Sequence, residues 1–427
     1  MTSNNSCFVW KWLKGETEPV VAGKIVMDGE QMVFVYGSSY LARDNREAIY
    51  SEELPLNGET HSASDLSLKN FSCIRDAAPD AWGRRVIHSK LDRNLDDFLD
   101  EMTYMMNSSS DRIGSIDFQE SNIEYIPRGE EQASLDELES AATIISEGRP
   151  LPLDLDKALL HGTSLGGARP KAMIYDDEHK FIAKFSAQTD TYDIVKSEYV
   201  AMRLAKLCGL NVAEVKLVHT NGKDALLVER FDREKHSNGG WLRNSMVSAL
   251  TVLGLDEGIA HYSTYPELVD KMQLLCADFK QDARELFERI VFNVMVGNTD
   301  DHARNHAFFV DGDQLTLTPA YDICPQARTG GEASHGMTIH EGSNKSLIQN
   351  CLRAAPTFKV SETDAVDIIK NQIATINREF KAVCDEVGLP YQTRKILWRS
   401  AMLNDYIFNH TGDEYKNIVT YELEQNT

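Results

Sequence analysis

One short segment in the C-terminal half combines the side chains that phosphoryl transfer requires. Its sequence is Asn298-Thr299-Asp300-Asp301-His302-Ala303-Arg304-Asn305, and Asp322 follows seventeen residues later. Asp300 and Asn305 have the D-x-x-x-x-N spacing of a kinase catalytic loop, which also needs a later aspartate to hold magnesium. We therefore predict that Asp300 is the catalytic base, that Asn305 and Asp322 are Mg²⁺ ligands, and that Mg-ATP is the phosphoryl donor.

Asp301 is a rival for the role of base, but the five-residue offset to Asn305 selects Asp300. His302 is expected to shape the loop by hydrogen bonding. A lone D-x-x-x-x-N also occurs in helix-capping turns. A strand hairpin expected over 307–317, which carries the chain to Asp322, favours the catalytic interpretation.

The elements that must position these groups are visible in the apolar pattern. An apolar stripe at helical spacing over 286–295 predicts a buried helix that ends at Gly297, directly before the loop. Strands are expected at 172–175, 181–185 and 225–228, and a helix at 198–207.

Lys184, within the second of these strands, fits a lysine that pairs the α- and β-phosphates of ATP, and Glu198 fits its ion-pair partner. The plainer alternatives are a solvated strand lysine and an ordinary glutamate at a helix start. At the strand end, backbone groups of Glu229 and Phe231 would hydrogen-bond adenine. An ion pair between Glu229 and Arg230 at a simple strand end is an equally good interpretation.

A glycine-rich turn precedes the lysine strand. Gly162, Ser164, Gly166 and Gly167 would let backbone amides approach phosphates. The turn matches neither G-x-G-x-x-G nor G-x-x-x-x-G-K-[ST], and a tight hairpin is the alternative. A phosphate on Ser164 would place about two negative charges where the ATP phosphates should lie, which would switch the site off.

Elsewhere the pattern predicts a hairpin over 20–36, helical structure over 73–106 and a polar linker near 128–150. Ser361 and Asp364 resemble a capping box that opens a long helix. Its apolar stripe could form a coiled-coil dimer seam, but such a stripe more often packs on its own domain.

Composition narrows the class of protein. The net charge of −22 argues against a broad nucleic-acid surface. No apolar run approaches the roughly 18 residues of a membrane helix, and the first residues lack the pattern of a secretory signal. The seven scattered cysteines suit a reducing cytoplasm, without disulfides or zinc. We therefore expect a cytoplasmic protein with no membrane contact.

Together these segments resemble the HipA family of bacterial serine/threonine kinases, the toxins of HipA–HipB toxin–antitoxin systems. The matching stretches are residues 79–85, 111–114, 164–171, 182–185, 227–233, 297–305 and 317–322. The resemblance implies an α+β, two-lobed fold similar to protein kinases and phosphatidylinositol kinases. It divides the chain into an N-terminal accessory β-rich subdomain (1–125), an N-lobe core (150–232) and a mainly helical C-lobe (233–427).

The resemblance also implies a function. ATP would be bound by Lys184, the Ser164 loop and the Glu229–Phe231 hinge, and Ser164 matches a serine that family members autophosphorylate. Family targets include aminoacyl-tRNA synthetases, whose inactivation stalls translation and growth. The usual partner is a small helix-turn-helix antitoxin of the HipB type, so DNA would be met only through that partner. The effect of Asp301 beside Asp300 stays open, and substrate identity is not carried over.

Two other functions are compatible with the same residues. A small-molecule phosphotransferase would use the same active-site groups on a different acceptor. A corepressor that acts only in complex with an antitoxin would need no turnover. The presence of Lys184, Asp300, Asn305 and Asp322 together argues against the second alternative, since a pure binding module does not need all four.

Overall fold

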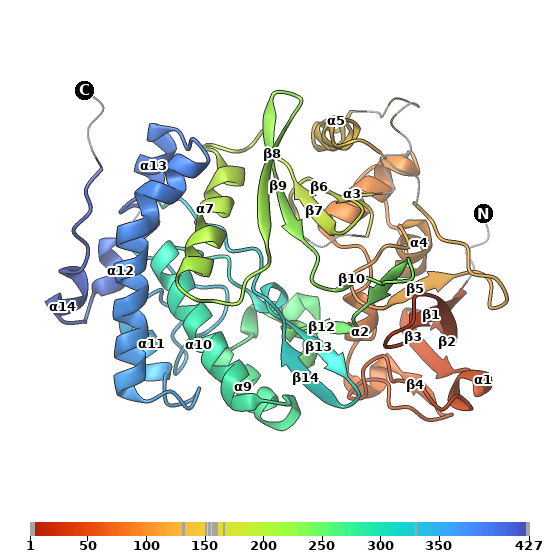
Figure 1. Cartoon of the computed structure of the whole chain (residues 1–427). Helices are drawn as coiled ribbons and strands as arrows, with labels where there is room; N and C mark the ends of the chain where they lie inside the picture. Colours follow the sequence, from red (N-terminus) through yellow and green to blue (C-terminus); the bar gives the residue numbers. More distant parts are fainter. Residues whose placement is uncertain are drawn as a thin grey trace. The chain divides into compact units, whose positions relative to one another are not determined.

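The computed structural model describes residues 5–129, 133–149, 152, 155, 161–164, 167–328 and 331–423. Figure 1 shows its helices and strands. The chain forms two compact units that alternate along the sequence. The first comprises the described residues of Met1–Thr189, Val218–Val247 and Phe309–Asp313, and the second those of Asp190–Leu217, Ser248–Phe308 and Gln314–Thr427. The division at 1–125, 150–232 and 233–427 stays a prediction.

The first unit contains a five-stranded sheet in the order β4-β3-β2-β1-β5. Its strands are β1 (Ser6–Trp12), β2 (Pro19–Asp28), β3 (Gln31–Tyr36), β4 (Thr60–Ser62) and β5 (Ile116–Gln119). The predicted hairpin over 20–36 is confirmed, because β2 and β3 pair antiparallel with Asp28 opposite Gln31. Alternate side chains such as Ile25 and Phe34 are fully buried, as period-2 alternation requires.

The second sheet of this unit has the order β6-β7-β9-β8. Its strands are β6 (Lys171–Tyr175), β7 (Lys180–Lys184), β8 (Val215–Thr220) and β9 (Lys223–Glu229). The strands predicted at 172–175, 181–185 and 225–228 are therefore confirmed. Antiparallel pairing places Lys184 opposite Lys171 on one side and opposite Leu226 on the other.

The polar stretch near 128–150 is not simply a linker, and that prediction was wrong. It contains α5 (Leu135–Ser146), which begins at a complete capping box between Ser134 and Glu137. Its apolar face, including Leu138 and Ile145, packs in one core with Trp82 of α3 and with the β6-β7-β9 strands. Charged residues on the outer face masked this amphipathic pattern.

The remaining elements of the first unit are short. They are α1 (Ser38–Leu41), η1 (Ala63–Leu66), α2 (Ser72–Arg75), α3 (Ala81–Lys90), α4 (Glu101–Asn107), β10 (Arg233–Lys235) and β11 (Trp241–Arg243). The helical region expected over 73–106 is thus divided into separate helices.

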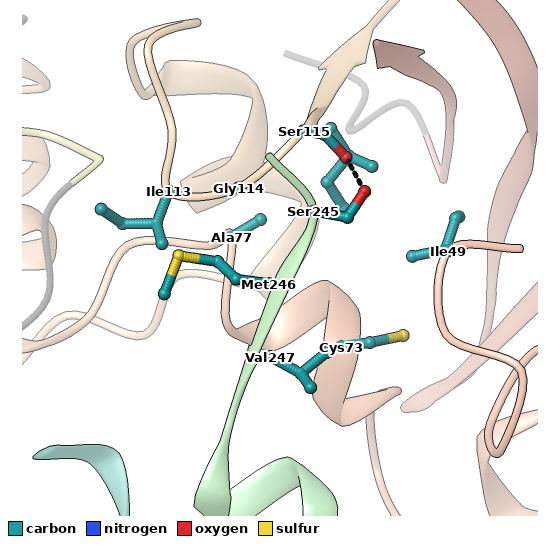
Figure 2. A pocket seen from close by; sticks show the side chains of 10 residues that line it. Ile49, Cys73, Ala77, Ile113, Gly114, Ser115, Ser245, Met246 and Val247 are labelled. Carbon is teal, nitrogen blue, oxygen red and sulfur yellow. Dashed lines mark hydrogen bonds between the residues drawn. The ribbon is translucent and has the colours of Figure 1, made fainter. Parts of the chain in front are cut away.

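A small internal cavity lies between Cys73 of α2, Ser115 and Ser245 (Figure 2). The hydroxyl oxygens of Ser115 and Ser245 are hydrogen-bonded at 2.6 Å. None of the predicted site residues lines this cavity.

The second unit is mainly helical. Its elements include α7 (Ile194–Leu207), α8 (Ala249–Val252), η3 (Glu257–Tyr262), α9 (Tyr265–Leu275), α10 (Phe279–Val296), η4 (Ala303–Asn305), β14 (Gln314–Leu317), α11 (Ile348–Ala354), α12 (Glu362–Glu386), α13 (Tyr391–Leu397), η5 (Asp405–Phe408) and α14 (Asp413–Lys416). Three strands have residues in both units, namely β8 and the further strands β12 (Met246–Ser248) and β13 (Ala307–Asp311). Among the residues described above, no helix is long and apolar enough to cross a membrane.

The long helix α12 packs within its own unit, as the commoner of the two predicted arrangements requires. Ser361 caps its start by accepting a hydrogen bond from the Asp364 N–H. Ile369, Ile373 and Phe380 are fully buried, and α12 contacts both α7 and α10 (Figure 1). The apolar stripe is therefore used inside the unit and is not available as a dimer seam.

Candidate active site

The predicted catalytic loop begins where α10 ends. Gly297 caps the helix in the left-handed conformation with φ of 71°, and its N–H donates to the Asn293 carbonyl. A side chain could not be accommodated here, because a Cβ would lie 2.6 Å from the Ala401 carbonyl oxygen. Glycine therefore lets the chain leave the helix abruptly, as the sequence predicted.

The next aspartates occupy opposite environments. Asp300 is exposed, whereas Asp301 is 1% exposed. The Asp301 carboxylate binds His306 Nε2 at 3.0 Å through Oδ1, and its Oδ2 accepts from Asn293 Nδ2 at 2.8 Å and from the Tyr265 hydroxyl. All of its partners are protein groups, so Asp301 holds the loop in place and leaves Asp300 as the carboxylate that faces solvent.

The pKa values of Asp300 and Asp301 are also shifted in opposite directions. Burial would raise the pKa of Asp301, but His306, His335 and Tyr265 lower it to about 2. The pKa of Asp300 is raised, first because its neighbours remove part of the water from its carboxylate and then by the negative charges of Asp322 and Asp301. His302 opposes this rise. An exposed carboxylate with a raised pKa is a better proton acceptor than an ordinary one.

Asn305 and Gly336 both contact the backbone of the predicted catalytic loop. Asn305 lies in η4, is 7% exposed and donates from Nδ2 to the Asp300 carbonyl at 3.1 Å. A Cβ on Gly336 would come within 2.9 Å of the Asp301 carbonyl oxygen. His302 Nδ1 is buried without a hydrogen-bond partner in the described part of the chain. The expected role of His302, to shape the loop by hydrogen bonding, gains no support from this nitrogen and stays a prediction.

The hairpin predicted before Asp322 is confirmed, because β13 and β14 are neighbouring strands and the chain continues from β14 to Asp322. The Thr318 N–H donates to the Ala307 carbonyl at 3.0 Å and closes the base of the hairpin. Arg289 of α10 donates to the Thr318 carbonyl at 2.7 Å, and the Tyr321 hydroxyl donates to the Arg304 carbonyl at 2.7 Å. The segment that carries Asp322 is thereby tied both to α10 and to the catalytic loop.

These residues suit a magnesium ion that is shared with a nucleotide. Within the described residues, no three His, Cys, Asp or Glu side chains cluster closely enough to hold a metal by themselves. Mg²⁺ commonly uses one or two protein carboxylates and fills its other positions with phosphate oxygens and water. Asn305 uses its amide nitrogen within the loop, and its amide oxygen is the atom that could contact a metal ion. Asn305 and Asp322 therefore fit the predicted role.

Lys184 and the glycine turn belong to the first unit. Lys184 ends β7 and is 8% exposed, which excludes the alternative of a solvated strand lysine. Ser164 is 2% exposed, and its hydroxyl donates to the Asp111 carbonyl at 3.2 Å. Gly167 has φ of 87°, and its N–H donates to the Asp80 carboxylate. Gly166 lies outside the described residues.

Asp111 organises a buried ionic cluster that sequence reasoning did not identify. Its carboxylate binds Lys180 at 2.7 Å, Arg230 at 3.0 Å and Arg233 at 3.1 Å, and these cations hold its pKa well below the usual range despite burial. Asp232 binds both arginines as well. The only signal in the sequence was the resemblance over 111–114 and 227–233, because ionic partners between 69 and 122 residues apart leave no local pattern.

This cluster changes the interpretation of the proposed hinge. Arg230 pairs with the two aspartates, so the alternative in which it simply pairs with Glu229 is wrong. The Arg230 N–H donates to the Lys180 carbonyl at 2.8 Å. Since successive residues of a strand direct their backbone groups to opposite edges, those of Glu229 point away from β7. Phe231 is half-buried, with its ring 5.8 Å from that of Phe309.

Glu198 lies in the second unit, on α7. The helix begins at Ile194, four residues earlier than predicted, with Asp193 as its cap. Glu198 is consequently inside the helix and 3% exposed, not at an exposed helix start. The predicted residues thus form two groups, one in each unit, and the pairing of Glu198 with Lys184 stays a prediction.

Comparison with known proteins identifies the family. The model of the HipA-like C-terminal domain matches residues 163–380, which contain every predicted site residue of both groups except Gly162. This chain belongs to the HipA family. The HipA protein of Shewanella oneidensis, solved with HipB and its operator DNA, aligns with 95% of this chain and 99% of its own at a TM-score of 0.69 and 19% identity. The chain therefore has the α+β, kinase-like HipA fold.

Two curated relatives agree with this assignment. The serine/threonine-protein kinase toxin HipA of Shewanella oneidensis is 27% identical over 183 residues, which cover 38% of this chain and 42% of the relative. The putative kinase Y4mE of Sinorhizobium fredii is 27% identical over 227 residues, covering 50% and 54%. The chain thus spans about half the length of these two curated relatives, one of which is named as a HipA kinase toxin and the other as a putative kinase.

Proposed function

We propose that this HipA-family chain is a Mg-ATP-dependent serine/threonine protein kinase. The observation that carries the proposal is the pair of adjacent aspartates, one exposed with a raised pKa and one buried in the hydrogen bonds that fix the loop. A phosphoryl-transfer site works by positioning and electrostatics, so it needs a fixed loop with one free carboxylate.

In this proposal, Asp300 accepts the proton of the acceptor hydroxyl as its oxygen bonds to the γ-phosphorus, while the bond from that phosphorus to the β–γ bridging oxygen breaks and ADP leaves. Asn305 and Asp322 would hold Mg²⁺, which would neutralise charge on the phosphates. Lys184 steadies the α- and β-phosphates, and Glu229 and Phe231 bind adenine through their backbone groups. Glu198 orients Lys184, and Ser164, Gly166 and Gly167 form the phosphate turn.

Autophosphorylation of Ser164 follows from the same proposal. Its hydroxyl is 2% exposed and bonded to the Asp111 carbonyl, so the turn must leave this position before the serine can react. A phosphate would then add about two negative charges beside the site for ATP and oppose nucleotide binding.

The proposed partner is a helix-turn-helix antitoxin of the HipB type, with DNA reached only through it. The support is the related Shewanella oneidensis structure, in which HipA is found with HipB and operator DNA. The proposed target is a protein, with an aminoacyl-tRNA synthetase as the first to test, and its modification would inhibit translation and growth. The expected cytoplasmic location stays a prediction.

The test compares the protein with its Asp300→Asn variant, each incubated with Mg²⁺ and γ-labelled ATP, alone and with cell extract. We expect label on Ser164 and on one extract protein, and neither in the variant. Asp313→Asn is the matched control, because Asp313 is exposed in the turn before β14 and should label normally. Label on small molecules alone would favour the phosphotransferase alternative. Growth arrest that survives Asp300→Asn would favour the corepressor.

A further inference from the structure

An aromatic contact joins the segment after α14 to the long helix α12. The ring centroid of Phe380 on α12 lies 4.6 Å from that of Trp398, which follows α13. The ring of Tyr421 meets the Trp398 ring edge-on at 5.0 Å and lies 6.1 Å from the Phe380 ring. Phe380 is 0% exposed and Trp398 is 4% exposed, whereas Tyr421 is half-buried. The segment that carries Tyr421 therefore lies against α12 (Figure 1).

Two side chains also hold the backbone of this segment. Asn377 Oδ1 accepts from the Thr420 N–H at 2.9 Å and from the Tyr421 N–H at 2.8 Å. Asn377 Nδ2 donates to the Thr420 hydroxyl at 3.2 Å, and the Trp398 indole N–H donates to the Tyr421 carbonyl at 3.2 Å. An amide oxygen has two lone pairs, so one asparagine can bind two successive residues. Asn377, Phe380 and Trp398 thus form one docking site, which Thr420 and Tyr421 occupy.

The segment in this docking site does not belong to a helix or a strand. The helix α14 ends at Lys416, and the described residues 417–423 form no regular element. Thr420 and Glu422 are exposed, and so is the hydrogen bond from the Thr420 N–H to Asn377. Regions with few buried contacts and exposed hydrogen bonds open at a much lower free energy than the core. We therefore expect the segment to leave the docking site while the helical unit stays folded.

The contacts have the form that proteins use to recognise peptides. Aromatic anchors often carry much of the energy of an interface, and hydrogen bonds to an extended backbone fix the register of a bound peptide. We propose that Asn377, Phe380 and Trp398 bind an extended segment of a partner protein, and that Tyr421 is the chain's own competitor for this site. The partner segment carries an aromatic ring at the position of Tyr421 and a serine or threonine at the position of Thr420.

A partner protein is favoured over a second copy of this chain. The chain's own segment is tethered beside the docking site, and a short tether gives an effective concentration in the millimolar range. The same segment of a second copy would make the same contacts without this advantage, so it would not displace Tyr421. A partner segment displaces Tyr421 by making further contacts on either side of the aromatic ring.

The test measures the binding of a fluorescein-labelled peptide, with the sequence of residues 413–423, to the whole chain by fluorescence anisotropy. Tyr421→Ala weakens the competitor, so this variant should bind the peptide at least about tenfold more tightly than the wild type. Adding Asn377→Ala to that variant should weaken binding at least about tenfold, because it removes three hydrogen bonds to the peptide. The same peptide with Tyr421→Ala should also bind at least about tenfold more weakly.

Two comparisons decide the outcome. Tyr262→Ala removes a 68% exposed tyrosine elsewhere in the same unit, and it should bind the peptide as the wild type does. Equal peptide affinities of the wild type and Tyr421→Ala would overturn the inference, as would equal affinities for the peptide and its alanine form. Circular dichroism checks that each variant is folded, and the comparison of the two peptides needs no variant of the protein beyond Tyr421→Ala.

Hydrogen exchange tests the same inference without any substitution. In the wild type, the amides of Thr420 and Tyr421 should exchange at least about 100-fold faster than the amide of Phe380 in α12. Equal rates would mean that the segment leaves only when the unit unfolds, which contradicts its role as a competitor.

Sedimentation distinguishes the occupants. The sedimentation coefficient of the wild type should not change with Tyr421→Ala. A dimer that this substitution abolishes would make a second copy the occupant and would overturn the assignment to a partner protein. None of these measurements depends on the proposed kinase activity.

Discussion

Replacing Asp301 by asparagine should destabilise the second unit although it changes only one atom type. The Asp301 carboxylate is 1% exposed and accepts from Tyr265 and Asn293 through Oδ2, while Oδ1 binds His306. An asparagine placed with its oxygen toward Tyr265 and Asn293 keeps two of these bonds. Its NH₂ group then faces His306 Nε2, which must become an acceptor, and the charge of the ion pair is lost.

The size of the effect follows from the pKa of Asp301. Its partners lower the pKa from the ordinary 3.8 to about 2, and each pKa unit corresponds to about 1.4 kcal/mol, so the charged interactions contribute about 2 kcal/mol near pH 7. Because the folded pKa is the lower one, this stability is present above about pH 4 and is lost as the pH falls through 3.8 toward 2.

This contribution to the free energy of unfolding can be measured by urea unfolding at several pH values from 7 to 3. The proteins compared are the wild type, Asp301→Asn and Asp313→Asn. Asp301→Asn should lose about 2 kcal/mol at pH 7, with the difference shrinking toward pH 3. Asp313→Asn, at an exposed turn position, should stay within about 0.5 kcal/mol of wild type. Equal midpoints for the two variants at pH 7, or a gap that grows on acidification, would refute the reasoning.

Three other substitutions test the site. Asp322→Asn should lower the raised pKa of Asp300, because it removes a nearby negative charge, and carboxyl NMR titration of the two proteins would show the acid transition of Asp300 at lower pH. Gly297→Ala should cost at least about 2 kcal/mol in denaturant unfolding, since the left-handed φ and the contact with Ala401 both penalise a side chain. Arg289→Met should cost about 1–3 kcal/mol, because the buried Thr318 carbonyl loses its donor and the half-buried Glu285 loses its cation but keeps the Asn211 N–H. An unchanged melting temperature would contradict this.

The features that the sequence predicted well are those fixed by nearby residues. The end of α10 at Gly297 follows from a stripe of apolar side chains and one glycine, and the β2–β3 hairpin follows from alternation and a short turn. The preference for Asp300 over Asp301 as the base also rested on a local feature, the offset to Asn305, and stays a prediction. The comparisons support the family, and the structure gives Asp300 the exposed position that the predicted role needs.

The features that it missed depend on distant partners or on a weak local signal. The cluster around Asp111 joins residues more than 100 positions apart, and no single-sequence pattern records such a pairing. The partners of Asp301 come from α9, α10 and the end of the loop, so its role could not be seen from the motif. The helix α5 did have a signal, since Ser134 and Glu137 have capping-box spacing, but its charged face was taken for a linker.

The two adjacent aspartates explain how one short loop can be both rigid and reactive. Asp300 lies in a turn and is exposed, whereas the next residue, Asp301, is buried and held by the side chains of Tyr265, Asn293 and His306. Their pKa values are moved in opposite directions, which is the usual sign that two carboxyl groups have different roles. In the proposed mechanism, loss of either carboxylate ends catalysis by a different route. Without Asp300 the fold would keep its stability but lack the proposed base, and without Asp301 the proposed base would remain but would no longer be held in position.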